Sequence, residues 1–161
     1  MVIFSLINFT AYVLLMILMF GIPTSLSDTF YLLQAHKKWA SVAFVLLMYS
    51  IAITLVAPII DATPDGLQIF AFIPIVGIGF VGAAPLFKGQ DSLVHKVAAL
   101  AAAIGSIFWV LLTHIDYWPY LVFSAILFGT IMLLSKTIKC YVFWAEMVVF
   151  YSMYAILISL A

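Results

Sequence analysis

The sequence predicts an all-α fold, specifically a polytopic transmembrane helix bundle of about six spans. Of the 161 residues, 68% are hydrophobic and 7% are charged, and the mean hydropathy is +1.32. So few polar side chains cannot cover a water-facing surface. A bilayer core of roughly 30 Å takes about 20 apolar residues per helix, and such stretches recur along almost the whole chain. We therefore expect a single integral membrane domain over residues 1–161.

The spans follow one another with short connections. They are expected at residues 3–22, 39–59, 67–87, 93–113, 118–135 and 141–160. The first span lacks the basic leading region and the small-residue cleavage site of a signal peptide, so we expect it to remain in the mature protein. Short connections predict that consecutive helices are antiparallel neighbours.

Small residues make the third and fourth spans smooth, which predicts that these two helices pack closely. In the third span they are Gly77, Gly79, Gly82, Ala83 and Ala84. In the fourth they are Ala98, Ala99, Ala101, Ala102, Ala103 and Gly105.

The distribution of charge predicts the orientation of the bundle. All six basic residues are lysines, and they fall in alternate connections: Lys37 and Lys38, Lys88 and Lys96, Lys136 and Lys139. The intervening connections carry acids instead, namely Asp61, Asp65 and Asp116. By the positive-inside rule, the lysine-bearing connections lie in the cytoplasm and both termini lie on the non-cytoplasmic side. We expect a multi-pass protein of a bacterial inner membrane or of another membrane that bounds a cytoplasm.

The stretch GIPTSLSDTF, residues 21–30, interrupts the apolar sequence. Pro23 disfavours a helical backbone at the residue before it, so the first span should end or kink there. Ser25 and Asp28 fit the S-x-x-[DE] capping pattern, in which the serine hydroxyl accepts from the third amide. This pattern predicts a short interfacial helix from about residue 26. In a second interpretation, Ser25, Ser27 and Asp28 line the cytoplasmic mouth of a cavity.

Glu146 lies seven residues beyond Lys139, roughly 10 Å into the last span at 1.5 Å per residue. An acid inside a span is costly and by default indicates a functional site. It needs a partner, and the candidates are Lys136, Lys139, Lys96 and His95. The alternative is that its side chain reaches back to the cytoplasmic interface.

Two polar stripes have helical spacing. The stripe in the fourth span predicts either a packed helix face or a cavity wall, and consists of His95, Ala99, Ala102, Ser106 and Thr113. The stripe in the first span predicts hydrogen bonds between helices, and consists of Ser5, Asn8 and Tyr12.

The sequence predicts no cofactor, no metal site and no nucleic-acid partner. Cys140 is the single cysteine, which excludes an internal disulfide. Of the three histidines, His36, His95 and His114, the last two lie at opposite ends of one span, roughly 28 Å apart, so one zinc ion cannot bind all three. A site of His36, His95 and a carboxylate such as Asp28 or Glu146 stays open, but its spacing matches no ligand motif. The sequence also contains no G-x-S-x-G or Walker motif, so it favours a protein without catalytic activity.

Three short motifs resemble the DRAM-like family of six-span membrane proteins and its bacterial relatives. They are PTSLSDTFY after the first span, FVGAAPLF closing the third and VHKVAAL opening the fourth. The resemblance implies a six-span fold and an involvement in lipid handling or remodelling. It also implies family-typical positions at Pro23, Ser25, Asp28, Gly82, Pro85 and His95.

The functional hypothesis is the binding or translocation of a lipid-like or small amphiphilic molecule in a polar vestibule that faces the cytoplasm. The expected ligand-binding residues are Ser25, Ser27, Asp28, His95, Ser106 and Glu146. A second hypothesis is a non-catalytic membrane subunit or scaffold whose helices dock a partner subunit or a second copy, and a third is an intramembrane lipid hydrolase. The lipid bilayer is the expected partner under all three.

Overall fold

The computed structural model of the chain describes residues 1–83 and 91–161, without the side chains of residues 91, 92, 94 and 95. In these ranges the regular structure is helical, which confirms the predicted all-α class. The α-helices are α1 (Val2–Phe20), α2 (Asp28–His36), α3 (Val42–Ala62), α4 (Gln68–Ala83), α5 (Asp91–Thr113), α6 (Trp118–Leu134) and α7 (Tyr141–Leu160). Two short 3₁₀ turns, η2 (Ile115–Tyr117) and η3 (Ile138–Cys140), precede α6 and α7.

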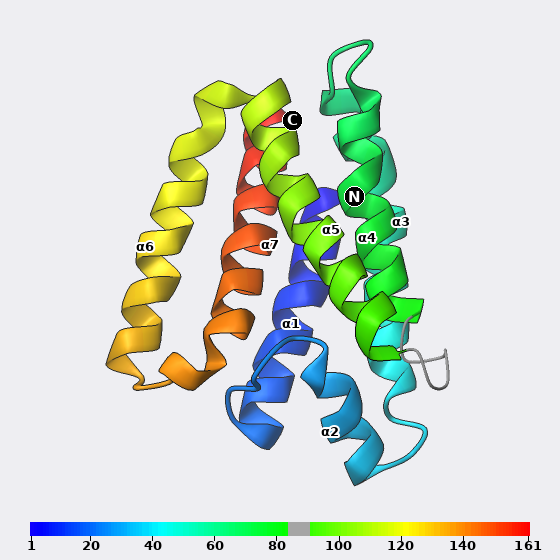
Figure 1. Cartoon of the computed structure of the whole chain (residues 1–161), viewed down its shortest axis with the longest axis vertical. Coiled ribbons are helices and arrows are strands. Elements are labelled where there is room, and N and C mark those ends of the chain that lie inside the picture. Colours follow the sequence, from blue (N-terminus) through cyan, green and yellow to red (C-terminus); the bar gives the residue numbers. More distant parts are fainter. Residues whose placement is uncertain (84–90) are drawn as a thin grey trace.

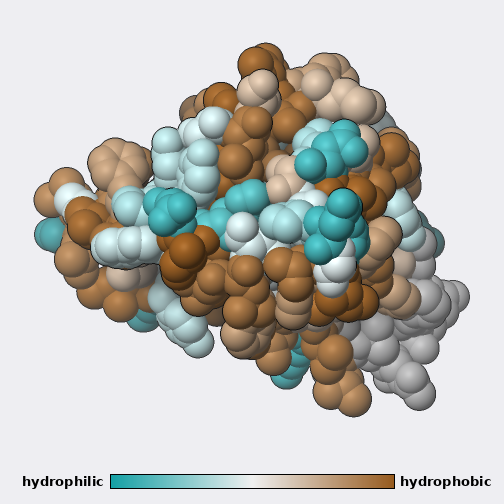
Figure 2. All heavy atoms as spheres, turned by 90° about the horizontal axis from the view of Figure 1, so that it is seen from above, coloured by the Kyte–Doolittle hydropathy of each residue, from teal (hydrophilic) through white to brown (hydrophobic). Residues whose placement is uncertain are grey.

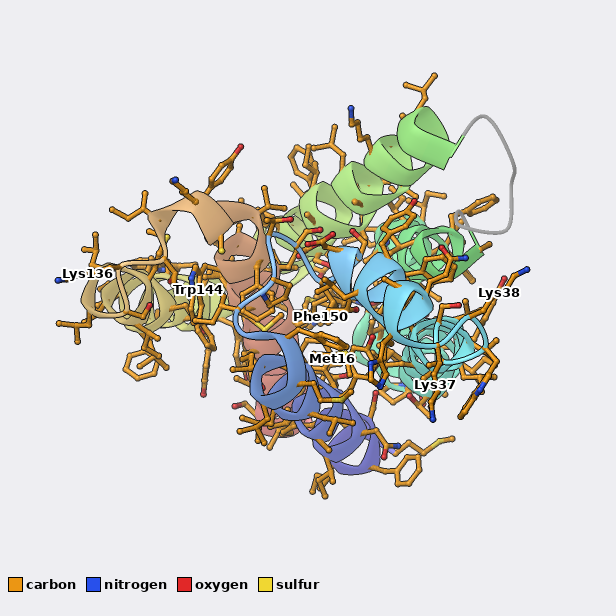
Figure 3. All side chains as sticks on the ribbon, turned by 90° about the horizontal axis from the view of Figure 1, so that it is seen from below. Met16, Lys37, Lys38, Lys136, Trp144 and Phe150 are labelled. Atoms are coloured by element: carbon orange, nitrogen blue, oxygen red, sulfur yellow. The ribbon has the colours of Figure 1, made fainter. Side chains whose placement is uncertain are left out.

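The six long helices run alternately up and down, and the shorter α2 lies at the lower end of the bundle (Figure 1). Both termini lie toward the upper end, opposite the turns that carry Lys37, Lys38 and Lys136, which Figure 3 labels in the view from below. The described connections that carry lysines, which alternate with connections without lysine along the sequence, therefore lie at one end of the structure. Lys88 lies outside the described residues.

Within residues 1–83 and 91–161, five segments are long and apolar enough to cross a membrane: Val2–Phe20, Val42–Ala62, Lys96–Thr113, Ile115–Leu134 and Ile138–Leu160. The remaining apolar helix, α4, has 16 described residues. Its predicted span, 67–87, runs on into residues outside the described ranges. The first helix ends at Phe20, two residues before the predicted boundary, because Gly21 turns the backbone to a φ of 78°.

Close approach of α4 to its neighbours confirms the packing predicted from the small residues. A Cβ atom at Gly77 would lie 2.5 Å from the backbone nitrogen of Ala102 in α5. A Cβ at Gly105 would lie 2.6 Å from Cγ2 of Ile73, and one at Gly82 would lie 2.7 Å from Cβ of Met48 in α3. The helices α3, α4 and α5 therefore pack side by side as one layer, and they contact one another at positions where only glycine fits.

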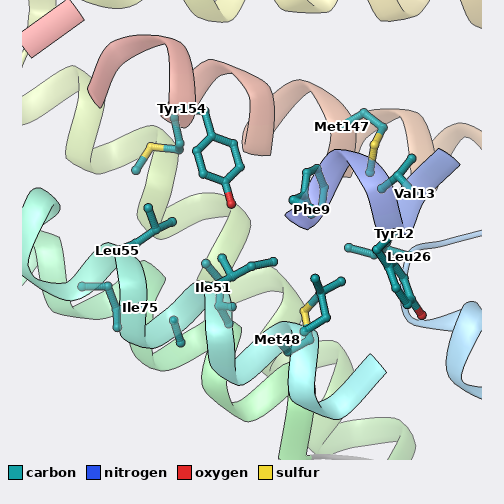
Figure 4. Packing of buried hydrophobic residues seen from close by; sticks show 14 of the residues in the cluster. Phe9, Tyr12, Val13, Leu26, Met48, Ile51, Leu55, Ile75, Met147 and Tyr154 are labelled. Carbon is teal, nitrogen blue, oxygen red and sulfur yellow. The ribbon is translucent and has the colours of Figure 1, made fainter. Parts of the chain in front are cut away.

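On the other side of α3, the helices α1 and α7 complete the core. Phe9 of α1 is fully buried and stacks on Phe150 of α7 with ring centroids 4.5 Å apart. The Tyr154 hydroxyl lies 2.9 Å from Oγ of Ser5, a hydrogen bond between helices of the kind predicted for the first stripe. Figure 4 shows Phe9 and Tyr154 on the side of the core that faces α3, where Ile51 and Leu55 lie.

The helix α6 lies at one edge of the bundle and packs mainly on α7 (Figure 1). Of its side chains only Ser124 is buried, while Phe123, Ile126 and Leu134 are among the exposed ones. At the end of the molecule where the termini lie, hydrophilic residues gather in the middle of the face and hydrophobic ones surround them (Figure 2). Apolar residues around the sides of the bundle, with hydrophilic residues at its ends, suit a protein that spans a bilayer.

Candidate functional site

The connection from α1 to α2, residues 21–27, is held by its own side chains. Oγ of Ser25 accepts a hydrogen bond from the backbone N–H of Asp28 at 3.1 Å, as the pattern predicts, but the N-cap residue of α2 is Ser27, whose side chain makes no cap bond. Oδ2 of Asp28 in turn accepts from the Thr24 hydroxyl at 3.0 Å. The hydroxyls of Ser25 and Ser27 lie 3.0 Å apart. These polar groups fold the connection into a compact turn and start α2 at Asp28 rather than at about residue 26.

The same connection docks on the first turns of α7. The backbone N–H of Phe143, one of the helix-start amides that lack an intrahelical acceptor, donates to the carbonyl oxygen of Thr24 at 3.2 Å. Oε2 of Glu146 accepts from the backbone N–H of Leu26 at 2.6 Å. Glu146 thus has a backbone partner 120 residues away in the sequence, whereas the sequence suggested a lysine or histidine side chain.

A chain of hydrogen bonds leads from α1 to the same residue, Leu26. The Thr29 hydroxyl donates to the carbonyl oxygen of Leu26 at 2.6 Å. Since its single hydrogen is used there, the Tyr12 hydroxyl donates to Oγ1 of Thr29, at 2.7 Å. Tyr12 is 9% exposed and Thr29 is fully buried, so both bonds lie in the protein interior, where such chains reinforce one another. Glu146 is therefore fixed to a connection that is itself fixed to α1.

Glu146 lies on the wall of a cavity of about 50 Å³ between the layer α3–α4–α5 and α7. Leu26 contributes from the connection, and Phe150 and Tyr154 follow Glu146 on α7 at intervals of four residues, which places them on one helix face. The opposite wall is apolar except for Ser106, and includes Met48, Leu55, Pro74, Ile78, Ala99 and Ala103. Among the described lining residues, Glu146 is the only acid, and none is a lysine or a histidine.

The structure brings together two of the residues predicted for the site and separates three others. Glu146 and Ser106 share the cavity, where the Ser106 hydroxyl donates to the carbonyl oxygen of Ala102. Ser25, Ser27 and Asp28 belong to the docked connection, next to Leu26 and outside the described cavity lining.

His95 is part of α5, but its side chain lies outside the described residues, as do the predicted positions Ala84 and Pro85. Sequence reasoning missed Leu26, Phe150 and Tyr154. The four-residue spacing from Glu146 was a signal for the two aromatic residues, while no sequence pattern indicates the Leu26 peptide.

At the opposite end of the bundle, His114 joins α5 to η2. Its ring packs edge-on against Trp109 and Tyr117, with centroids 4.8 and 6.1 Å away. Burial lowers the pKa of this imidazole below its ordinary value of 6.5, and hydrogen bonding to the Ala62 backbone partly offsets the effect. Its Nε2 is buried and has no hydrogen-bond partner within the described part of the chain.

Residues 1–83 together with the described side chains of 91–161 contain no group of three or more His, Cys, Asp or Glu side chains placed to hold an ion. The one cysteine, Cys140, has a half-buried thiol whose Sγ lies 3.5 Å from the carbonyl oxygen of Ile22.

Comparisons of the chain with protein-family models, with curated proteins and with solved structures give no match. Functional interpretation therefore depends on the physical character of the site.

Proposed function

We propose that the chain is an integral membrane protein that binds or translocates a lipid-like or small amphiphilic molecule in the cavity between α3–α4–α5 and α7. The observation that carries the proposal is the Glu146 carboxylate on the wall of an otherwise apolar cavity. Apolar walls favour a hydrocarbon chain, and the half-buried acid can hold one polar head group.

The orientation proposed from the lysines places this acid near the cytoplasmic side. Glu146 lies about two helical turns from Lys139, and the described turns with Lys37, Lys38 and Lys136 lie at the same end of the bundle (Figure 3). The resemblance to DRAM-like proteins, some of which handle lipids, agrees with this function. We therefore propose a ligand site that opens toward the cytoplasmic leaflet.

Entry of a ligand requires the helices to move. A cavity of about 50 Å³ accommodates a few water molecules, not a long chain. The helices around the cavity are not equally closely packed: α5 contacts α7 far less than it contacts α4. Separation of α5 from α7 is thus the movement that would enlarge the cavity while the glycine-mediated contacts of α4 and α5 stay intact.

The proposal is tested by mass spectrometry of small molecules that co-purify with the protein. Ala103→Leu fills the cavity, and Ala101→Leu makes the same change at a residue of α5 that lines an outer apolar groove instead. An amphiphile enriched with wild type and Ala101→Leu but lost from Ala103→Leu supports the site. Equal enrichment in all three proteins, or in none, contradicts it.

A docking function is the second candidate, because of α6. Only 6% of its most apolar window is buried, against 28–44% in the other four candidate spans. Lipid can cover such a helix, and so can a partner helix. Native mass spectrometry after extraction in a mild detergent tests this candidate: a stoichiometric complex supports docking, and a monomer contradicts it.

A further inference from the structure

We propose that the amphiphile bound in this cavity carries a cationic amine head group, which the Glu146 carboxylate recognises. The inference rests on the proposed function and narrows it to one class of ligand. It follows from the charge balance of the cavity, from the bonding of the carboxylate and from the aromatic residues beside it.

The charge balance of the described lining is one-sided. Glu146 is its only acid, and no lysine or histidine among the described lining residues offsets it. A carboxylate in apolar surroundings is stable only with a compensating charge or with several hydrogen bonds. A phosphate or carboxylate head group would add a second negative charge, whereas an ammonium group would neutralise the first.

The carboxylate keeps capacity for a ligand. An ionised carboxylate has about four acceptor positions, and the connection before α2 supplies one donor, the Leu26 N–H at 2.6 Å to Oε2. That bond, together with the Phe143 to Thr24 contact, holds the side chain in place without neutralising its charge. An alkylammonium group offers three N–H donors and a full positive charge. It can therefore fill the acceptor positions of the carboxylate that the Leu26 N–H leaves free and neutralise its charge.

Aromatic rings lie along the path from the acid into the cavity. Phe150 and Tyr154 line it at four and eight residues from Glu146. Their positions are fixed, since Phe150 stacks on Phe9 and the Tyr154 hydroxyl bonds to Ser5 (Figure 4 shows Tyr154 directed toward α3). Ring faces attract ammonium groups, most strongly where water is excluded. A head group leaving the carboxylate would therefore still meet favourable surfaces.

The test uses four probes with the protein in phosphatidylcholine nanodiscs at neutral pH. Decylammonium, decanol and decanoate share one chain and differ in head-group charge, while ethylammonium has the charged head with almost no chain. An alkylamine is protonated at neutral pH, as a lysine side chain is. Binding is measured by isothermal titration, with empty nanodiscs subtracted to remove partitioning into lipid.

Decylammonium should bind wild type at least tenfold more tightly than it binds Glu146→Gln, and more tightly than decanol or decanoate bind wild type. The glutamine carbonyl can still accept from the Leu26 N–H, so this variant removes charge and keeps the contact. Ethylammonium should bind weakly. Ala103→Leu should weaken decylammonium and decanol together, and the Ala101→Leu control should weaken neither.

The outcomes separate the two proposals. Equal affinities of decylammonium and decanol for wild type, with both lost in Ala103→Leu, would overturn the cation inference and leave the amphiphile cavity standing. Tighter binding of decanoate, or ethylammonium binding as well as decylammonium, would also overturn it. If no ten-carbon probe binds above empty nanodiscs, the proposed function itself fails. If Glu146→Gln does not fold, the ranking of the probes on wild type alone decides.

Discussion

The two edges of the bundle differ in how their glycines are used. In α4, Gly77 lies where a Cβ would be 2.5 Å from the backbone of α5, whereas a Cβ at Gly129 of α6 would meet nothing within 4 Å. Both residues are in helices of similar apolar character. The α4–α5 contact is thus a backbone-to-backbone interface, while α6 packs mainly on α7. We infer that the α3–α4–α5 layer is a rigid wall and that any movement around the cavity occurs on the side of α7.

The largest expected effect comes from adding one methyl group at the close contact. Gly77→Ala should lower the free energy of unfolding by about 1–3 kcal/mol, because the obstructing atoms are the backbone nitrogen and Cα of Ala102, which cannot rotate away. Gly129→Ala should be neutral or stabilising by up to about 1 kcal/mol, since alanine favours a helix over glycine. Thermal unfolding in detergent, followed by circular dichroism, measures both.

Gly79 provides the control within the same helix. It lies two residues from Gly77, and a Cβ there meets nothing within 4 Å. Gly79→Ala should therefore behave like Gly129→Ala. If Gly77→Ala were as harmless as the other two, the α4–α5 contact would be less rigid than the structure indicates and the contrast with α6 would be lost.

An equal or smaller effect is expected from interhelical hydrogen bonds. Nε1 of the fully buried Trp109 in α5 donates to Oγ1 of Thr63, the C-cap residue of α3, at 2.7 Å. Thr63→Val leaves that donor unpaired and should cost about 1–3 kcal/mol. At the other edge, the exposed bond of 2.8 Å between Tyr120 of α6 and Ser159 of α7 should be worth about 0.5 kcal/mol or less when Ser159→Ala removes it.

A double-mutant cycle sharpens this second contrast. Combining Thr63→Val with Trp109→Phe should give a smaller loss of unfolding free energy than the sum of the single losses, because the second change removes the donor that the first leaves unpaired. Strict additivity would mean that the Trp109 to Thr63 bond does not tie α5 to the end of α3.

Much of the fold follows from local patterns in the sequence. Apolar runs and their breaks predict α3, α5, α6 and α7 to within three residues, and small residues predict the α4–α5 contact. These features depend on neighbours one to four positions apart. The end of α1 was predicted two residues late because Gly21, rather than the residue before Pro23, is the point where the backbone turns.

The candidate site was less accessible to sequence reasoning. The hydrogen bond of Ser25 with the Asp28 amide is local and follows from the sequence pattern, although it lies before α2 rather than at its N-cap, Ser27. The partner of Glu146 is a backbone amide 120 residues away, and any residue other than proline carries such an amide. The peptide of Leu26 therefore has no signature in composition or spacing. Likewise, the cavity arises where α7 meets the α3–α4–α5 layer, and its shape depends on the packing of whole helices.

The smallest expected effect concerns the connection between the α3–α4–α5 layer and α6, where His114 follows α5 and precedes η2. Burial lowers the pKa of its imidazole, so the unfolded chain binds a proton at higher pH than the folded chain does. The contribution of His114 to stability is therefore fully present above its ordinary pKa of 6.5 and is lost as the pH falls below that value.

Melting temperatures measured between pH 8 and pH 5 should thus decline more steeply for wild type than for His114→Gln, while His36→Gln, at an exposed position of α2, controls for the loss of a histidine elsewhere. Parallel curves for wild type and His114→Gln would mean that this connection tolerates a charged imidazole. The α5–α6 connection would then be as loosely held as α6 itself, and the boundary of the rigid region would have to be drawn at Trp109 instead.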